Sequence, residues 1–232
     1  MSLILNEHDF DKIIDVPIDG VRISGDLETP IAEEALKNDK RIDKIIIPAS
    51  CISRRLNKIA SEILIDYKNI NSIDIVVVLT GAVIFASDLS RFLYTAGGIN
   101  ADFHLVKTSV YQGEIKKDNE EQREVRMLLP VGDIAKRDIL IIEDIIDQGF
   151  TLSWLTKHLK HEKNANSVRI CTLLNKKLDN PTPAVKQIRD NLHIDYSGFS
   201  IPDCWVAGYG IDTAGNFRNM PFIITVNEEY YR

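Results

Sequence analysis

Cysteine is scarce in this sequence of 232 residues. The three cysteines, Cys51, Cys171 and Cys204, are an odd number, lie far apart and form no CxxC or Cys/His ligand pattern. These features argue against a disulfide framework and against a structural zinc site. We therefore expect the chain to fold without cross-links, in a reducing, cytoplasmic setting.

Long apolar runs and an excess of positive charge are also missing. No apolar run approaches the roughly 20 residues of a membrane-spanning helix, and the first ten residues, which include Glu7 and Asp9, do not resemble a signal or transit peptide. The formal net charge is −6, which produces a field that repels polyanions. Neither nucleic acid nor a membrane is expected as a partner.

The sequence does contain apolar runs of strand length that alternate with stretches of helical periodicity. This alternation predicts an α/β fold with a mostly parallel central sheet flanked by helices. Strands are expected at Ile45–Ile47, Ile75–Leu79, Phe103–Val106, Ile139–Ile142, Val168–Leu174 and Val206–Ile211. Helices are expected after a capping Ser50, after Gly81 and around Leu152, Leu155 and Leu159.

We expect one domain over residues 1–232, with a core of about 45–175. The more weakly patterned ends, about 1–44 and 176–232, are expected to form a small hood over the carboxyl edge of the sheet, where open α/β folds bind ligands. The polar stretch from Gln112 to Arg126 is predicted to be a surface loop. Pro181 and Pro183 are expected to interrupt regular structure between the last two strands.

The most informative segment is Ile139–Leu152, which reads ILIIEDIIDQGFTL. A buried strand brings Glu143 and Asp144 to its carboxyl end, and Asp147 follows three positions later. Gly149 permits a tight turn into the next helix, so the N–H groups of residues 148–151 can converge on a phosphate, with the Thr151 hydroxyl as a further donor.

Carboxylates beside an anion site fit a ligand that carries both a phosphate and a sugar. A ribose 5-phosphate offers hydroxyl groups to Glu143 and Asp144, and acidic groups stabilise the positive charge that develops at its anomeric carbon when a leaving group departs. The segment is not a Walker loop, because Phe150 stands where that loop has lysine. The alternative is that these acids only end a strand and support the following helix.

This segment resembles the phosphoribosyl pyrophosphate signature of the phosphoribosyltransferases, and the chain from about Ile45 to about Asn227 resembles the hypoxanthine-guanine phosphoribosyltransferases. The resemblance implies that Glu143 and Asp144 hold the ribose hydroxyls and that Asp147 is the general base for the purine N7 proton. The 5-phosphate would be held by the turn of Gln148, Gly149, Phe150 and Thr151.

The same resemblance assigns the purine, pyrophosphate and metal contacts. Lys176 would donate to the 6-oxygen of the base, which favours hypoxanthine and guanine over adenine because lysine cannot accept a hydrogen bond. Trp205 would stack on the base and Val206 would offer its backbone carbonyl. Asp212, with Glu143 and Asp144, would hold Mg²⁺. Pyrophosphate would be held by Arg218, Thr80 and Gly81, the latter two in a turn often built around a cis peptide.

Tyr111 matches a catalytic loop that closes over the reacting sugar, although Val110 stands where a serine is usual. Thr80, Gln148 and Phe150 also depart from the common family pattern, and Thr80 removes a lysine that would assist pyrophosphate binding. The resemblance implies a homodimer or homotetramer.

Three alternatives remain open at this point. The chain could be a xanthine- or adenine-preferring relative, a phosphoribosyl pyrophosphate-sensing regulator without catalysis, or a sugar-phosphate binding module. The net acidity and the presence of both Lys176 and Trp205 weigh against the regulator. Asp147 and Tyr111 have no role in a simple binding module.

Overall fold

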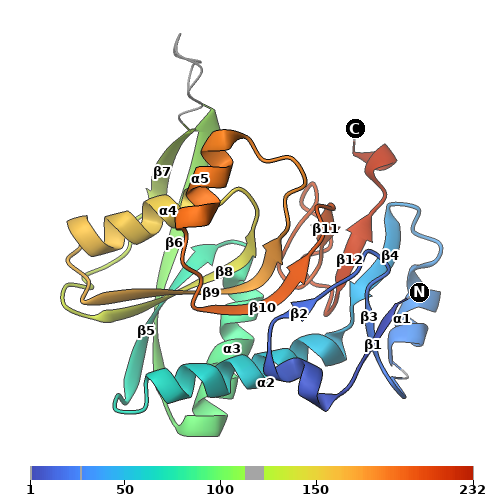
Figure 1. The fold of residues 1–232 in the computed structure, drawn as a ribbon, viewed down its shortest axis with the longest axis horizontal. Coiled ribbons are helices and arrows are strands. Elements are labelled where there is room, and N and C mark those ends of the chain that lie inside the picture. Colours follow the sequence, from blue (N-terminus) through green and yellow to red (C-terminus); the bar gives the residue numbers. More distant parts are fainter. Residues whose placement is uncertain (1, 27, 113–122, 232) are drawn as a thin grey trace.

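A computed structural model describes residues 2–26, 28–112 and 123–231 (Figure 1). Its central sheet has seven strands in the order β2-β10-β9-β8-β5-β6-β7. Every neighbouring pair is parallel except β6 and β7. The strands are β2 (Ile14–Asp15), β5 (Ser72–Leu79), β6 (Asn100–Gln112), β7 (Arg123–Leu129), β8 (Asp138–Ile146), β9 (Ser167–Lys176) and β10 (Tyr196–Ile201). The predicted α/β fold with a mostly parallel sheet is confirmed.

The two faces of this sheet are covered by different helices, because side chains alternate along each central strand. Ile75 and Val77 of β5 face one core, whereas Val76 and Val78 face the other. Helices α2 (Ala49–Asp66) and α3 (Ala82–Gly97) cover the first face. Helix α4 (Phe150–Lys157), which continues as a π-helical turn (His158–Glu162), covers the second face, and α5 (Pro183–Asn191) lies beside it (Figure 1).

A smaller lobe lies beside the carboxyl ends of the parallel strands. It contains the antiparallel sheet β11-β12-β4 and the two-stranded parallel sheet β1-β3 (Figure 1). Its elements are β1 (Leu3–Leu5), β3 (Val21–Ile23), α1 (Glu28–Leu36), β4 (Ile42–Ile47), β11 (Val206–Ala207) and β12 (Ile223–Val226). The two ends of the chain therefore meet in one lobe.

The membership of the sheets differs from the expected division at residues 45 and 175. The strand at Ile45–Ile47 belongs to β4, which pairs with β12 in the small sheet. The central sheet in turn gains β10 and the short edge strand β2 from outside the expected core. A run of apolar residues predicts that a strand is buried, but it does not say which sheet the strand joins.

Several local expectations were wrong. Ser50 does not cap α2, which begins at Ala49 after Pro48; its hydroxyl instead donates to Asp26. Only Val206 and Ala207 of the predicted last strand form a strand, because the following turn has positive φ angles at Gly208, Tyr209 and Gly210. Residues 123–126 of the expected loop begin β7, and residues 113–122 lie outside the described part of the chain.

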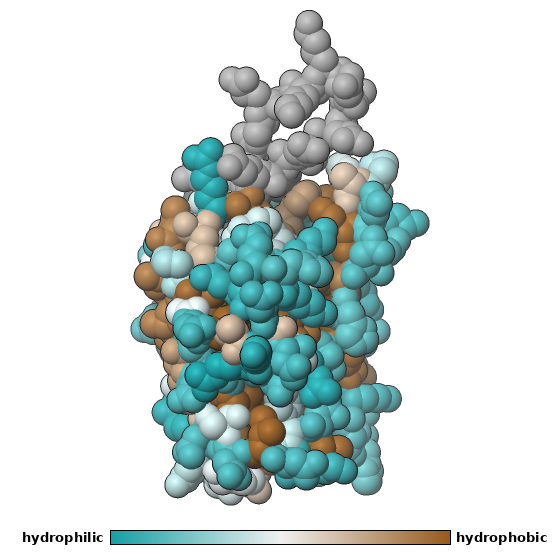
Figure 2. Space-filling view, turned by 90° about the vertical axis from the view of Figure 1, so that its left-hand side faces the viewer, coloured by the Kyte–Doolittle hydropathy of each residue, from teal (hydrophilic) through white to brown (hydrophobic). Residues whose placement is uncertain are grey.

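The surface agrees with the acidic, polar composition. The side of the molecule in Figure 2 carries mainly hydrophilic side chains, with smaller apolar areas between them. Among the residues that the structure describes, no helix combines the length and the apolar character needed to cross a membrane.

Candidate active site

The acidic end of β8 forms one wall of the candidate site. Burial raises the pKa of the Glu143 carboxyl well above its ordinary value, and the negative charge of Asp144 raises it further. Burial also raises the pKa of Asp144, although hydrogen bonds with Glu143 and from the N–H of Ile145 partly oppose this shift. Two adjacent, desolvated carboxyl groups favour a ligand that brings hydroxyl donors or positive charge.

The turn after β8 forms the floor of a cavity of about 390 Å³. Gly149 has a φ of 84° and caps α4, which begins at Phe150. The first N–H groups of a helix have no acceptors within the helix, and the glycine cap has no side chain to accept from them. Because Gln148, Phe150 and Thr151 all line the cavity, this turn has the form of an anion site.

A second turn packs directly against the acidic wall. The Leu79–Thr80 peptide bond is cis, as the resemblance implied for this position. A Cβ on Gly81 would lie 1.5 Å from Oδ2 of Asp144 and a Cβ on Gly210 would lie 2.0 Å from the carbonyl oxygen of Gly81. Three segments far apart in the sequence thus meet here with no room for a side chain between them.

Arg218 and Asp212 lie on the loop that follows β11. The guanidinium of Arg218 is 2.5 Å from Oδ1 of Asp212 and donates to the carbonyl of Gly210 at 2.7 Å. Its positive charge also lowers the pKa of Asp144 against the effect of burial. Arg218 therefore lies near both the acidic wall and the Gly81 turn, as a pyrophosphate ligand requires.

The opposite wall is formed by Lys176 at the end of β9. Its ammonium group is 3.8 Å from Oδ2 of Asp147 and 3.7 Å from Oδ1 of Asp203, and only 13% of its side chain is exposed. The largely buried Lys176 carries its charge between two carboxylates, while Asp147 remains open to solvent on the side of the cavity. An acceptor on a ligand can replace either carboxylate as the lysine's partner.

Trp205 and Val206 continue this wall into the small lobe. The Trp205 ring is 39% exposed and packs at a tilt against Tyr231, with 5.5 Å between the ring centroids. Val206 is buried and pairs with Thr225 of β12. An indole with one ring face supported by the protein has surface left over for a flat ligand.

The structure thus brings the predicted residues of β8 together with Gly81, Arg218 and Asp212 on one side and with Lys176 on the other. For Tyr111 the structure gives the backbone, which pairs with Glu124 between β6 and β7; its side chain lies outside the described part. No group of three or more His, Cys, Asp or Glu side chains in the described ranges is arranged to hold a metal. Glu143, Asp144 and Asp212 therefore do not form a ready-made metal site.

Two residues at the site were missed. Asp203 holds Lys176, and Arg189 of α5 donates to backbone carbonyls beside Asp147 and Lys176. Asp203 stood inside the PDCW motif and could have been singled out by its charge. Arg189 carried no signal without α5, which was hidden by the reading of Pro183 as a break.

Residues 48–213 match the family described as Phosphoribosyl transferase domain, and the chain belongs to this family. A hypoxanthine-guanine phosphoribosyltransferase of Mycobacterium tuberculosis is 32% identical over 82% of this chain and 89% of its own length. A hypoxanthine phosphoribosyltransferase of Buchnera aphidicola is 36% identical over 79% of this chain and 96% of its own length.

A solved structure gives the same relationship from the fold. The crystal structure of a hypoxanthine phosphoribosyltransferase from Staphylococcus aureus superposes with a TM-score of 0.69 at 26% identity, covering 89% of this chain and all of the other. The similarity therefore includes the central sheet, the acidic turn and most of the smaller lobe.

Proposed function

We propose that this protein is a hypoxanthine-guanine phosphoribosyltransferase of purine salvage. It transfers the 5-phosphoribosyl group of phosphoribosyl pyrophosphate to hypoxanthine or guanine and releases IMP or GMP and pyrophosphate. The observation that carries the proposal is the shared edge of β8 and β9, where two buried carboxyls and a glycine-capped helix lie beside the Asp147–Lys176 pair. The names of the relatives support the same reaction.

In this reaction the acidic wall binds the sugar. Glu143 and Asp144 accept hydrogen bonds from the ribose hydroxyls and stabilise the positive charge at the anomeric carbon as pyrophosphate leaves. The amides and hydroxyl of residues 148–151 hold the 5-phosphate. Gly81 and Thr80 contribute backbone groups to pyrophosphate, and Arg218 contributes a guanidinium, which suits phosphate oxygens.

The base binds on the opposite side, above the end of β9. Lys176 donates to the 6-oxygen, Trp205 stacks on the ring, and the carbonyl of Val206 accepts from the edge of the base. As N9 attacks the anomeric carbon, Asp147 takes the proton from N7. Tyr111, from β6, closes over the sugar and excludes water. The whole of residues 1–232 acts as one domain in this scheme.

Mg²⁺ is part of the proposal, and the donors present fit it. The carboxylates of Glu143, Asp144 and Asp212 are hard oxygen ligands, and the raised pKa of Glu143 and of Asp144 reflects negative charge that a cation would compensate. Mg²⁺ typically takes only one or two protein carboxylates and completes its shell with water and phosphate oxygens, which agrees with the lack of a three-residue cluster in the described ranges. When bound, it would neutralise charge on the departing pyrophosphate.

The proposed assembly is a homodimer or homotetramer in the cytoplasm. Exposed apolar side chains on β6 and β7 support self-association, because Phe103 and Leu105 are 45% exposed and Leu128 is 54% exposed. Light scattering coupled to size-exclusion chromatography measures the assembly directly, and a monomer at all concentrations would contradict this part of the proposal.

The test is a spectrophotometric panel of hypoxanthine, guanine, xanthine and adenine with phosphoribosyl pyrophosphate, with and without Mg²⁺. We expect turnover of hypoxanthine or guanine that requires Mg²⁺, and little turnover of adenine. Preference for adenine would contradict the role of Lys176. Binding of phosphoribosyl pyrophosphate without release of pyrophosphate from any base would indicate a regulator instead.

The Asp147→Asn variant belongs to the same experiment. Removal of a general base lowers kcat by about 10²–10⁴-fold, whereas the amide keeps the shape of the side chain. We therefore expect a large loss of kcat and a small change in the Kd of IMP measured by calorimetry. A variant with wild-type kcat would exclude Asp147 as the base.

A further inference from the structure

Arg189 of α5 joins two segments of the proposed site from behind. One of its terminal nitrogens donates to the carbonyls of Ile146 at 3.3 Å and Asp147 at 3.0 Å. The other donates to the carbonyl of Lys176 at 3.1 Å and to the side-chain oxygen of Asn175. A single guanidinium therefore spans the ends of β8 and β9, next to the two residues proposed to treat the base.

These carbonyls need an outside donor for a physical reason. In a turn whose N–H groups converge on a phosphate, the carbonyl groups point away from the ligand and cannot use it as a partner. An unpaired, partly buried carbonyl costs free energy comparable to a lost hydrogen bond. Arg189 meets this need for Ile146 and Asp147 at once, and the fixed fork of its guanidinium extends to Lys176.

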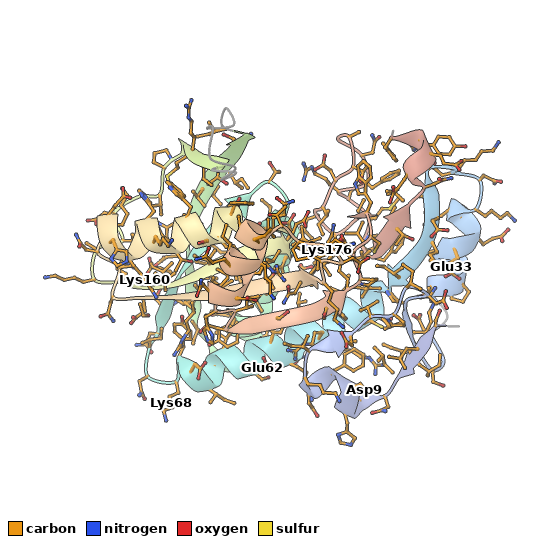
Figure 3. All side chains as sticks on the ribbon, turned by 45° about the horizontal axis from the view of Figure 1, so that its top comes forward. Asp9, Glu33, Glu62, Lys68, Lys160 and Lys176 are labelled. Atoms are coloured by element: carbon orange, nitrogen blue, oxygen red, sulfur yellow. The ribbon has the colours of Figure 1, made fainter. Side chains whose placement is uncertain are left out.

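The contact also fixes how closely α5 approaches the phosphate turn. A Cβ on Gly149 would lie 3.3 Å from Ile188 and 3.4 Å from the Cδ atom of Arg189. Figure 3 shows Lys176 beside α5 at the carboxyl end of the sheet, on the side where α5 crosses β9. The helix thus packs on the turn itself as well as on the ends of the two strands.

On the basis of the proposed function, we infer that Arg189 is a positioning residue that sets the distance between Asp147 and Lys176. The Asp147 carboxylate and the Lys176 ammonium are 3.8 Å apart, and both must reach the same purine, one at N7 and the other at the neighbouring 6-oxygen. Arg189 touches neither side chain and acts through their backbones, so it orients the base without taking part in proton transfer.

Arg189→Ala tests this role. A displacement of about 1 Å in a catalytic group can cost about 100-fold in rate, so we expect kcat with hypoxanthine to fall about 10- to 100-fold. The KM for hypoxanthine rises as well, because Lys176 loses its anchor. The Kd of phosphoribosyl pyrophosphate, measured by calorimetry with Mg²⁺, stays within about twofold, since the amides and carboxyls that hold it remain.

Two further variants complete the comparison. Lys186→Ala removes one positive charge from an exposed position of the same helix, and it should leave kcat and both KM values unchanged. Arg189→Lys keeps the charge, but one ammonium group cannot bridge two strand ends, so its kcat should fall nearly as far as in Arg189→Ala. Arg189→Lys decides the question if Arg189→Ala does not fold.

Each outcome has one meaning. Wild-type kcat in Arg189→Lys and Arg189→Ala overturns the inference, and so does an equal loss in Lys186→Ala, which would indicate an effect of charge alone. Loss of phosphoribosyl pyrophosphate binding together with kcat also overturns it, because the arginine would then support the whole turn. Wild-type protein that turns over no purine refutes the proposed function itself, which separates that failure from a failure of Arg189.

Discussion

Glu143 lies at the end of β8 with a carboxyl group whose pKa burial and Asp144 raise well above the ordinary value. In the unfolded chain the same group ionises at its ordinary pKa. Protonated Glu143 therefore contributes stability that is fully present below the ordinary pKa and is lost as the pH rises through the raised folded-state pKa. At neutral pH this residue favours unfolding of the ligand-free protein.

Glu143→Gln should consequently stabilise the ligand-free protein. Removing a buried charge that lacks a cation is expected to raise the free energy of unfolding at neutral pH by roughly 1–3 kcal/mol, and the gain should shrink as the pH is lowered. The amide is a poorer acceptor for ribose hydroxyls, so affinity for phosphoribosyl pyrophosphate should fall by about 10- to 100-fold. Denaturant titrations at several pH values and calorimetry measure the two effects. A variant less stable than wild type at neutral pH would contradict this account.

Gly81 is required by its neighbour rather than by its own backbone, since its φ of −63° suits any residue. A Cβ at this position overlaps Oδ2 of Asp144, so Gly81→Ala must displace that carboxyl group from the sugar site. We expect kcat/KM for phosphoribosyl pyrophosphate to fall on the order of 100-fold. Gly132→Ala is the control, because its Cβ would meet only His104 at 3.7 Å, an ordinary contact.

At the scale of elements, the strands of the sheet and the helices that follow them were predictable because each carries its own pattern. Ile75–Leu79 and Ile139–Ile142 are uninterrupted apolar runs, and the structure buries both of their faces. The acidic turn was predictable for a related reason, since Glu143, Asp144 and Gly149 are adjacent in the sequence and all depend on one strand end.

Other elements could not be read from local pattern. Helix α5 begins with Thr182 as cap and Pro183 in its first turn, a regular helix start that resembles a break when proline is read alone. The partners of β4 and β12 depend on the meeting of distant segments, which no local pattern records. Contacts such as Gly210 on Gly81 and Asp203 on Lys176 were hidden for the same reason.

Tyr209 connects two of these distant elements. Its hydroxyl lies 2.5 Å from Oδ2 of Asp88 in α3, while the backbone of the next residue, Gly210, packs on Gly81 at the start of that helix. Burial and the hydrogen bond to Asp88 raise the pKa of Tyr209, so the phenol stays a donor at neutral pH. The loop that carries Asp212 is thereby tied to α3.

Tyr209→Phe removes this tie and leaves the ring in place. We expect a loss of about 1 kcal/mol in the free energy of unfolding, measured by denaturant titration. A looser loop should raise the KM for phosphoribosyl pyrophosphate more than the KM for hypoxanthine, because Arg218 and Asp212 contact the pyrophosphate end. Equal changes in both KM values would show that the tie supports the fold without orienting the loop.

At the scale of the whole molecule, a chain of net charge −6 must bind a highly charged anion. Long-range attraction cannot supply the affinity, so it must come from local groups: helix N–H groups at residues 148–151, Arg218, and Mg²⁺ between the acidic wall and the pyrophosphate. Binding should therefore depend on the metal far more than on the field of the protein.

Phosphoribosyl pyrophosphate with Mg²⁺ should accordingly stabilise the fold, whereas either component alone should do so much less. A ligand at 100 times its Kd adds about 2.7 kcal/mol to the free energy of unfolding, which a thermal scan detects as a rise in Tm. Because Glu143 contributes unfavourably only while its charge has no cation or hydroxyl partner, the rise should be smaller in Glu143→Gln at the same ligand concentration. Equal stabilisation of both proteins would place the sugar and the metal away from β8 and would require a different binding site.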